Sequence, residues 1–301
     1  GLTREDRVLF LVSGGGSALF EKPLIAPEEL ADITRQLLAC GADITEINTL
    51  RKRFSAVKGG RFAQRCAPAR VLSILLSDVL GDPPDMIASG PAYPDSTTCA
   101  QAMEIAERYG LRLSDDARCC LSMETPKALS NVETRITGSV RQLCASAERV
   151  CAALGYEPVF LTDRLSCEAR EAGAFLAAIA RSQAGRGRRA FILGGETVVH
   201  LTGDGLGGRN QELALSAARG MDGLTGALLF SVGSDGTDGP TDAAGGWVDG
   251  NTAAALREKG IDIEQVLARN DAYRALQACG GLITTGPTGT NVNDLTVLLV
   301  E

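Results

Sequence analysis

Histidine is almost absent from this sequence, since His200 is the only one among 301 residues. A zinc site built on several histidines is therefore excluded, and a His-dependent catalytic triad would have to use His200. The alternating run at residues 197–201 predicts a strand, with a structural or solvent-facing imidazole at His200. Catalysis by histidine is not expected.

Long apolar runs and an excess of positive charge are also missing. No run approaches the roughly 18 apolar residues that span a bilayer, and the first residues carry no signal-peptide pattern. The net charge of −7 and the pI near 5.0 argue against a surface for nucleic acids or membranes. We therefore expect neither a nucleic acid nor a membrane as a partner.

The nine cysteines contain no C-x-x-C pair, and their number is odd. Most of them lie in segments with apolar periodicity, which is typical of reduced, buried thiols rather than of a disulfide framework. This pattern predicts a cytoplasmic location.

Short apolar runs alternate with helical periodicity, which is typical of a layered α/β fold. The length of 301 residues is about twice that of a usual single domain. The polar stretch 122–131 contains Pro126 and suggests a boundary between residues 124 and 125. We expect strands at 8–12, 71–76, 133–137, 158–162, 190–193, 198–201, 227–232 and 295–300, and helices at 27–40, 102–109, 140–154 and 168–181.

Glycine is abundant, with 35 residues, and clusters where the predicted strands end. The first cluster directly follows the strand at 8–12, and its free backbone N–H groups and two hydroxyls suit an anion cradle. A tight strand-to-helix turn is the alternative. Leu19 replaces the third glycine of a dinucleotide fingerprint, and the absence of any Gly-Lys dipeptide excludes a Walker A loop. The cluster is Ser13-Gly14-Gly15-Gly16-Ser17.

The second cluster, residues 77–82, follows the strand at 71–76 at the sheet edge where open α/β proteins bind ligands. Asp78 and Asp82 are candidates to hold Mg²⁺, directly or through water. A capped turn is the alternative explanation.

The third cluster combines Gly194-Gly195-Glu196 with a glycine-rich run that leads into a helix. Arg209 and Asn210 are expected at the N-terminus of that helix, where free N–H groups and the helix dipole favour anions. An arginine there can meet a phosphoryl group with two donors at once. A hairpin loop with a surface arginine is the alternative.

Two further loops and one basic segment complete the candidates. Residues 233–246 hold Asp235, Asp238 and Asp242, which suit a cation or substrate hydroxyls but do not match EF-hand spacing; a solvated loop is the alternative. The loop 285–291 offers the hydroxyl of Thr288. The cations of residues 51–58 indicate either a surface for an anionic ligand or a solvated helix face.

Together these stretches resemble the glycerate 2-kinase family, the class II glycerate kinases. The resemblance spans essentially the whole chain, and the order and number of its motifs make it specific. It rests on residues 13–17, 48–52, 76–82, 87–91, 194–197, 207–212, 235–245 and 285–291.

The resemblance implies two α/β/α layered domains with the active site in the cleft between them. The first, residues 1–124, would be Rossmann-like with a mostly parallel sheet and incomplete at its N-terminus. The second, residues 125–301, would have a mixed sheet. The family's catalytic lysine lies in an N-terminal Gly-Lys segment that this chain does not contain, so we expect the chain alone to be inactive.

The implied reaction is Mg²⁺-dependent transfer of the γ-phosphoryl group of ATP to the 2-hydroxyl of D-glycerate, by a monomer or homodimer. The family's catalytic arginine maps onto Arg209, and we add Asp78 and Asp238 as catalytic candidates. Phosphate or substrate binding is expected from residues Ser13, Gly14, Gly15, Gly16, Ser17, Arg51, Glu196, Asn210 and Thr288, and metal binding from Asp78, Asp82, Asp235 and Asp238. An NAD(P)-dependent hydroxypyruvate reductase and a non-catalytic binder of small phosphorylated acids remain as alternatives.

Overall fold

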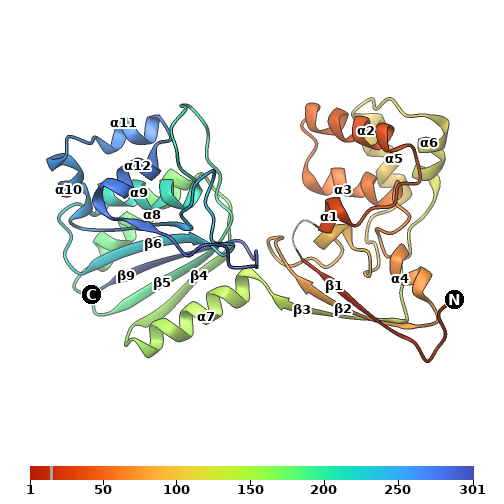
Figure 1. The fold of residues 1–301 in the computed structure, drawn as a ribbon, viewed down its shortest axis with the longest axis horizontal. Helices are drawn as coiled ribbons and strands as arrows, with labels where there is room; N and C mark the ends of the chain where they lie inside the picture. The colour runs from red at the N-terminus through yellow and green to blue at the C-terminus, as the bar shows by residue number, and fades with distance from the viewer. Residues whose placement is uncertain (14–15) are drawn as a thin grey trace. The chain divides into compact units, whose positions relative to one another are not determined.

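The computed structural model describes residues 1–13 and 16–301. The chain divides into two compact units, Gly1–Thr137 and Gly138–Glu301 (Figure 1). This division falls just before the last residue of the third strand of the first sheet, whereas the domain boundary expected from the sequence lies between residues 124 and 125. That boundary stays a prediction.

The sheet of the first unit contains β1 (Arg7–Val12), β2 (Arg70–Leu76) and β3 (Val132–Gly138), in that order. β1 and β2 are parallel, with Val8 paired to Val71. The predicted strands at 8–12, 71–76 and 133–137 are therefore confirmed. Since parallel neighbours end at the same edge, the turns that follow β1 and β2 share one edge of this sheet.

The helices of the first unit lie on one side of its sheet (Figure 1). Pro27 occupies the first turn of α2 and a capping box at Asp43 begins α3, as expected for helix N-termini. The helical elements are α1 (Gly16–Leu19), α2 (Pro27–Ala39), α3 (Ile44–Arg53), α4 (Arg61–Cys66), the 3₁₀ helix η1 (Ile87–Ser89), α5 (Cys99–Arg108) and α6 (Asp115–Ser122).

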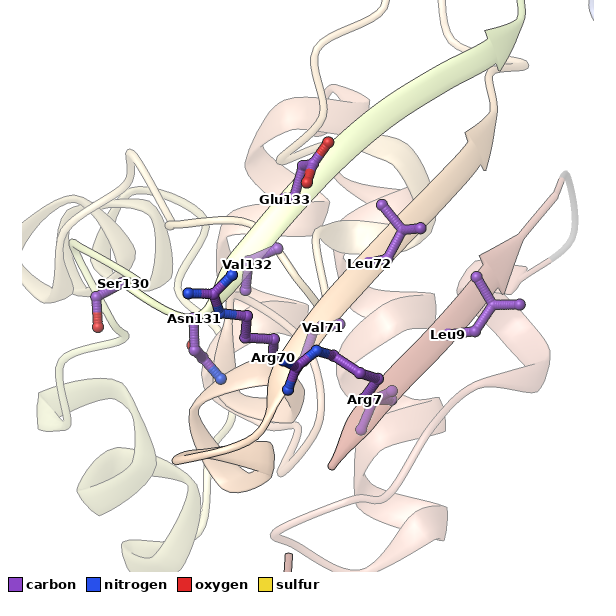
Figure 2. A pocket seen from close by; sticks show the side chains of 10 residues that line it. Arg7, Leu9, Arg70, Val71, Leu72, Ser130, Asn131, Val132 and Glu133 are labelled. Carbon is purple, nitrogen blue, oxygen red and sulfur yellow. The ribbon is translucent and has the colours of Figure 1, made fainter. Parts of the chain in front are cut away.

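The opposite face of this sheet is open in the described part of the chain. Leu9 and Leu11 of β1 are 60% and 66% exposed, although parallel sheets are usually covered on both faces. Figure 2 shows Leu9, Leu72 and Glu133 along a groove of about 490 Å³ on the three strands. In the described residues of the first unit, helices therefore cover one face of the sheet, and the third layer of the predicted α/β/α arrangement is not observed.

The second unit contains a six-stranded mixed sheet in the order β4-β5-β9-β6-β7-β8. β4 and β5 are parallel, and each of the other neighbouring pairs is antiparallel, so β9 runs opposite to both β5 and β6. The strands are β4 (Glu157–Leu165), β5 (Arg189–Gly195), β6 (Ala227–Gly233), β7 (Gly245–Asp249), β8 (Leu282–Ile283) and β9 (Asp294–Val300).

Helices cover both faces of the second sheet. α7 (Val140–Ala153) packs on β4 and β5, while α9 (Arg209–Met221) packs on β6 and β7 from the other side, next to α8 (Ala169–Gln183) (Figure 1). α8 and α9 approach closely at Gly173, which has no side chain. A Cβ at this position would clash with the carbonyl oxygen of Leu213. The remaining helices are α10 (Thr252–Glu258), α11 (Ile263–Ala268) and α12 (Ala272–Cys279).

The predicted α/β class, with a parallel first sheet and a mixed second sheet, is confirmed; the Rossmann-like assignment stays a prediction. The predicted strand at 198–201 is wrong, because Val198 makes only an isolated bridge to Glu168. The chain then contacts Asn270, whose side-chain oxygen accepts from the backbone N–H groups of Thr202 and Gly203. This segment is a largely exposed loop, in which Val198 and Leu201 are 49% and 80% exposed.

All nine cysteines are free, and four of them are buried. None of the helices in the described residues is long and apolar enough to cross a membrane. His200 is exposed, with Nδ1 3.5 Å from a carboxylate oxygen of Glu168. The expectation of a solvent-facing imidazole is confirmed.

Candidate functional site

The N-terminus of α9 is held by the carboxylate of Asp238. Oδ1 accepts from the backbone N–H of Asn210 at 3.1 Å and from its side-chain amide at 3.2 Å, and Oδ2 accepts from the N–H of Gln211 at 2.9 Å. A Cβ at Gly208 would clash with this carboxyl group, so the approach depends on glycine. The sequence correctly places Arg209 and Asn210 at a helix N-terminus, but an internal carboxylate already occupies these N–H groups.

Asp238 is almost completely buried, and this burial raises its pKa to about 6. The amide donors of Gln211 and Asn210 oppose the rise, as does a helix N-terminus in general. Both carboxylate oxygens are engaged by amides. Asp238 is therefore built to organise the start of α9.

Arg209 extends from the first turn of α9 toward two carboxylates. Nε and Nη2 donate to Oδ2 and Oδ1 of Asp294 at 2.6 and 3.0 Å, and Nη1 donates to Oε1 of Glu196 at 3.0 Å. Burial alone lowers the pKa of the guanidinium, but the hydrogen bonds and charge of Asp294, with Glu196, raise it above its ordinary value. Arg209 therefore remains charged and is fixed in orientation.

Asp294 was not among the candidates from the sequence. It is the first residue of β9, paired with Gly195 at the end of β5 and with Gly233 at the end of β6. Because β9 is antiparallel to both neighbours, its beginning lies at their carboxyl ends, where the glycine clusters also lie. An acidic residue immediately before the last apolar run was the available signal, but its significance depends on this strand order.

Asn210 is fixed from two sides. Its amide donates to Asp238, while its side-chain oxygen accepts from Ser231 Oγ at 2.6 Å. Ser231 in turn shares a hydrogen bond of 2.7 Å with Thr296 Oγ1 on β9. This chain of contacts ties the start of α9 to the central strands of the sheet.

Two predicted loops meet beside the end of β6. Thr288 donates through its backbone N–H to the carbonyl of Asp235 at 3.1 Å and through its hydroxyl to the carbonyl of Ser234 at 2.6 Å. The Asp235 carboxylate accepts from the N–H of Thr237 at 2.9 Å. The structure therefore brings the loops 233–246 and 285–291 together, and the Thr288 hydroxyl serves this junction.

The basic segment of the first unit is largely buried, so neither alternative from the sequence, a surface for an anionic ligand or a solvated helix face, describes Lys52 and Arg53. Lys52 Nζ lies 3.0 Å from a carboxylate oxygen of Asp95 and 3.4 Å from one of Asp85. The side chains of Lys52 and Asp95 are fully buried, and that of Asp85 is 16% exposed. Arg53 donates to Glu124 and to the carbonyl of Thr97. These cations are neutralised inside the unit and are not an open surface for an anion.

Lys58 and Arg51 converge on one carbonyl oxygen, that of Ser17 in α1. Lys58 Nζ donates to it at 2.6 Å and to Phe20 O at 3.2 Å, and Arg51 Nη2 donates at 3.1 Å. Burial lowers the pKa of Lys58 to about 8, although Glu21 opposes the change. The two cations thus lie against the helix that follows the first glycine cluster.

Within that cluster, Gly14 and Gly15 lie outside the described residues. Gly16 donates its N–H to the carbonyl of Ser13 at 3.2 Å, and the Ser17 hydroxyl lies 3.1 Å from that of Ser89. Ser89 also donates to the Asn48 side chain at 3.0 Å. Ser17 is thereby linked to η1 and α3.

The predicted metal ligands do not form a cluster. Within residues 1–13 and 16–301 there is no group of three or more His, Cys, Asp or Glu side chains that could hold a metal ion. Asp82 nevertheless has a left-handed backbone, with φ of 54°, and its buried Oδ1 has no hydrogen-bond partner in the described part of the chain. This orphaned oxygen fits a cation, whereas the amide-saturated carboxylate of Asp238 does not.

Comparisons with known proteins agree with this architecture. Residues 1–122 match the family model described as Domain of unknown function (DUF4147), and residues 189–294 match the MOFRL family. A D-glycerate 2-kinase of Thermotoga maritima is 53% identical over 99% of this chain and 73% of its own length. A glycerate 2-kinase of Pyrococcus horikoshii is 44% identical, over 99% of this chain and 71% of its own length.

The three-dimensional similarity is equally extensive. The crystal structure of a glycerate kinase from Thermotoga maritima matches with a TM-score of 0.97 and 52% identity, over 100% of this chain and 74% of that chain. Sequence motifs, fold and relatives therefore agree along the whole length of the chain. This chain belongs to the glycerate 2-kinase family and is a kinase.

Proposed function

We propose that the active form of the enzyme, which contains this chain, transfers the γ-phosphoryl group of ATP to the 2-hydroxyl of D-glycerate and forms 2-phosphoglycerate. The bond between the γ-phosphorus and the oxygen shared with ADP breaks, a bond from the substrate oxygen to phosphorus forms, and the hydroxyl proton is released. The relatives named glycerate 2-kinase support this acceptor. The absence of histidine chemistry is compatible with it, because phosphoryl transfer depends on positioning and charge stabilisation.

The observation that carries the proposal is the orientation of Arg209. A guanidinium held by two carboxylates at the start of α9 is charged and fixed before any ligand arrives. Its remaining N–H donors can bind phosphoryl oxygens in a defined geometry. Donors that need no reorganisation stabilise developing charge most effectively, so we assign Arg209 to the transferred phosphoryl group.

The other candidates take different roles in this proposal. Asp238 and Asn210 organise the N-terminus of α9, and Thr288 joins two loops. Glu196 is half exposed and binds Arg209 through one oxygen, which leaves it able to exchange with a ligand. We assign acceptance of the hydroxyl proton to Asp78, which is the catalytic role expected from the sequence.

In the first unit, we propose that residues 13–17 hold an anionic part of a ligand. Arg51 and Lys58, which both donate to the carbonyl of Ser17 in α1, supply positive charge next to these residues. We assign Asp82 to Mg²⁺, because it offers the orphaned oxygen. Bound Mg²⁺ neutralises phosphate charge in such reactions. The free cysteines support a reducing, cytoplasmic environment.

The test compares Arg209→Ala and Arg209→Lys with wild type in the active form of the enzyme, either this chain or a longer polypeptide that contains it. We expect kcat for ADP release with D-glycerate to fall about 10²- to 10³-fold in both variants. Arg209→Lys keeps a positive charge beside Asp294, so its loss of activity is separated from loss of folding. Arg257→Ala, which removes a more exposed arginine–aspartate pair with Asp222, is the control.

Phosphorus NMR of the product distinguishes the candidate functions. A 2-phosphoglycerate signal that depends on Arg209 supports the proposal, and full turnover in both Arg209 variants contradicts it. Nicotinamide oxidation with hydroxypyruvate would instead establish the reductase. Binding of ATP and D-glycerate by calorimetry without turnover in the longer polypeptide would establish a non-catalytic binder.

A further inference from the structure

Asp294 holds the part of Arg209 that lies farthest from solvent. Its side chain is 7% exposed, and its two oxygens take the Nε and Nη2 donors side by side, at 2.6 and 3.0 Å. This paired geometry restrains both the position and the plane of the guanidinium. Glu196 is 47% exposed and takes only Nη1, at 3.0 Å.

The fold fixes Asp294 more firmly than it fixes Glu196. Asp294 is hydrogen-bonded into the centre of the sheet, between β5 and β6. Glu196 lies just after the end of β5, outside the strand, and its second oxygen accepts a longer hydrogen bond, 3.3 Å, from the Asn293 amide. Asp294 is therefore the more constrained of the two carboxylates.

Gly233, at the end of β6, lies beside this pair. A Cβ at Gly233 would lie only 2.6 Å from the carbonyl oxygen of Thr237, but at an ordinary contact distance of 3.6 Å from Asp294 Oδ1. A side chain there would therefore displace the turn that follows β6 and leave the Asp294 carboxylate in place.

We propose that Asp294 is the positioning residue of Arg209, and that Glu196 is the partner that an incoming phosphoryl group replaces. This inference rests on the proposed function of Arg209. Asp294 acts through the arginine and touches no reacting atom. The pair presents Nη1 outward, so a ligand oxygen replaces Glu196 while Asp294 keeps the guanidinium plane unchanged.

The first test is a double-mutant cycle in the active form of the enzyme. We expect Asp294→Asn to lower kcat about 10- to 100-fold, with KM for D-glycerate changed less than about threefold, because orientation is lost rather than substrate contacts. In the Arg209→Ala background the same substitution should cause no further loss. Asp222→Asn disrupts a more exposed aspartate–arginine pair, with Arg257, and should leave kcat unchanged.

The second test reads the orientation directly, by NMR of the ¹⁵N-labelled 301-residue chain. The Nε–H signal of Arg209, identified by its absence in Arg209→Lys, should be protected from exchange with water in wild type and in Glu196→Gln. It should lose that protection in Asp294→Asn. If Asp294→Asn does not fold, Asp294→Glu keeps the charge, displaces the oxygens by one methylene, and should still lower kcat.

Three results would overturn the inference: kcat of Asp294→Asn within twofold of wild type, an equal loss in the Arg209→Ala background, or unchanged protection of the Nε–H group. Loss of activity in Arg209→Ala together with normal activity in Asp294→Asn refutes only the positioning role. Full activity in Arg209→Ala refutes the proposed function itself. The two failures are therefore distinguishable.

Discussion

The substitution Asp238→Asn removes a buried charge while nearly preserving the side-chain shape. Burial raises the pKa of this carboxyl from 3.8 to about 6, against the opposing amide donors of Gln211 and Asn210. At neutral pH the charged form is therefore about 3 kcal/mol less favourable in the folded chain than in the unfolded chain. That penalty is present in wild type and absent in the variant.

The pH dependence has a definite sign. Below the unfolded pKa of 3.8 both states hold the proton, so Asp238 imposes no charge penalty there. Between 3.8 and about 6 the folded state holds more protons than the unfolded state, so its stability decreases as pH rises. The unfolding free energy of wild type minus that of Asp238→Asn should consequently fall by about 3 kcal/mol from about pH 3 to about pH 7.

Urea unfolding followed by fluorescence measures this difference, because Trp247 in β7 is the single tryptophan of the chain and reports on the second unit. In the Asn variant an amide group replaces the carboxylate oxygen that accepts from the Gln211 N–H. The loss of this hydrogen bond lowers the unfolding free energy by an amount that does not vary with pH. Asp222→Asn is the control, since hydrogen bonding to Arg257 lowers the pKa of Asp222 and reverses the expected trend. A flat or rising difference for Asp238→Asn would show that the helix N-terminus stabilises the charge and would refute the reasoning.

Two further predictions concern the first unit and the chain as a whole. Asp95→Ala should reduce the free energy of unfolding by about 3–5 kcal/mol in thermal or urea unfolding followed by circular dichroism, because it leaves Lys52 buried without its nearest carboxylate. The exposed pair partner Asp222→Ala should cost far less, and equal losses in the two variants would argue against the buried network. The 301-residue chain alone should show little D-glycerate phosphorylation in an ADP-release assay, because it contains no Gly-Lys segment; robust turnover would disprove this requirement.

Local patterns account for much of the fold. Apolar periodicity identified α2, α7 and α8 and most of the strands, because burial of one helix face or of a strand leaves a repeating signal in neighbouring residues. The short β7 and β8 were missed. β7 begins with two glycines, which carry no apolar signal, and a strand of two residues is too short to show alternation.

The sequence placed some of the charged residues correctly and others wrongly, because only relations between neighbouring residues leave a local pattern. Arg209 was identified from its place before a helix, which is a property of adjacent residues. Lys52 and Arg53 were expected at the surface, either facing an anionic ligand or in solvent, because charge in a local segment usually faces water. Their carboxylate partners Asp95 and Glu124 are 43 and 71 residues away, so no local pattern could reveal the pairing.

The sequence by itself determined the α/β class, the placement of glycines at strand ends, and an arginine at the start of α9, because each is encoded by neighbours along the chain. Only the tertiary structure decided what those features contact. β9 enters between β5 and β6 in the antiparallel direction, and this brings Asp294 to Arg209 across 85 positions of sequence. Orientation of the guanidinium is thus a consequence of strand order, a long-range property that no local motif contains.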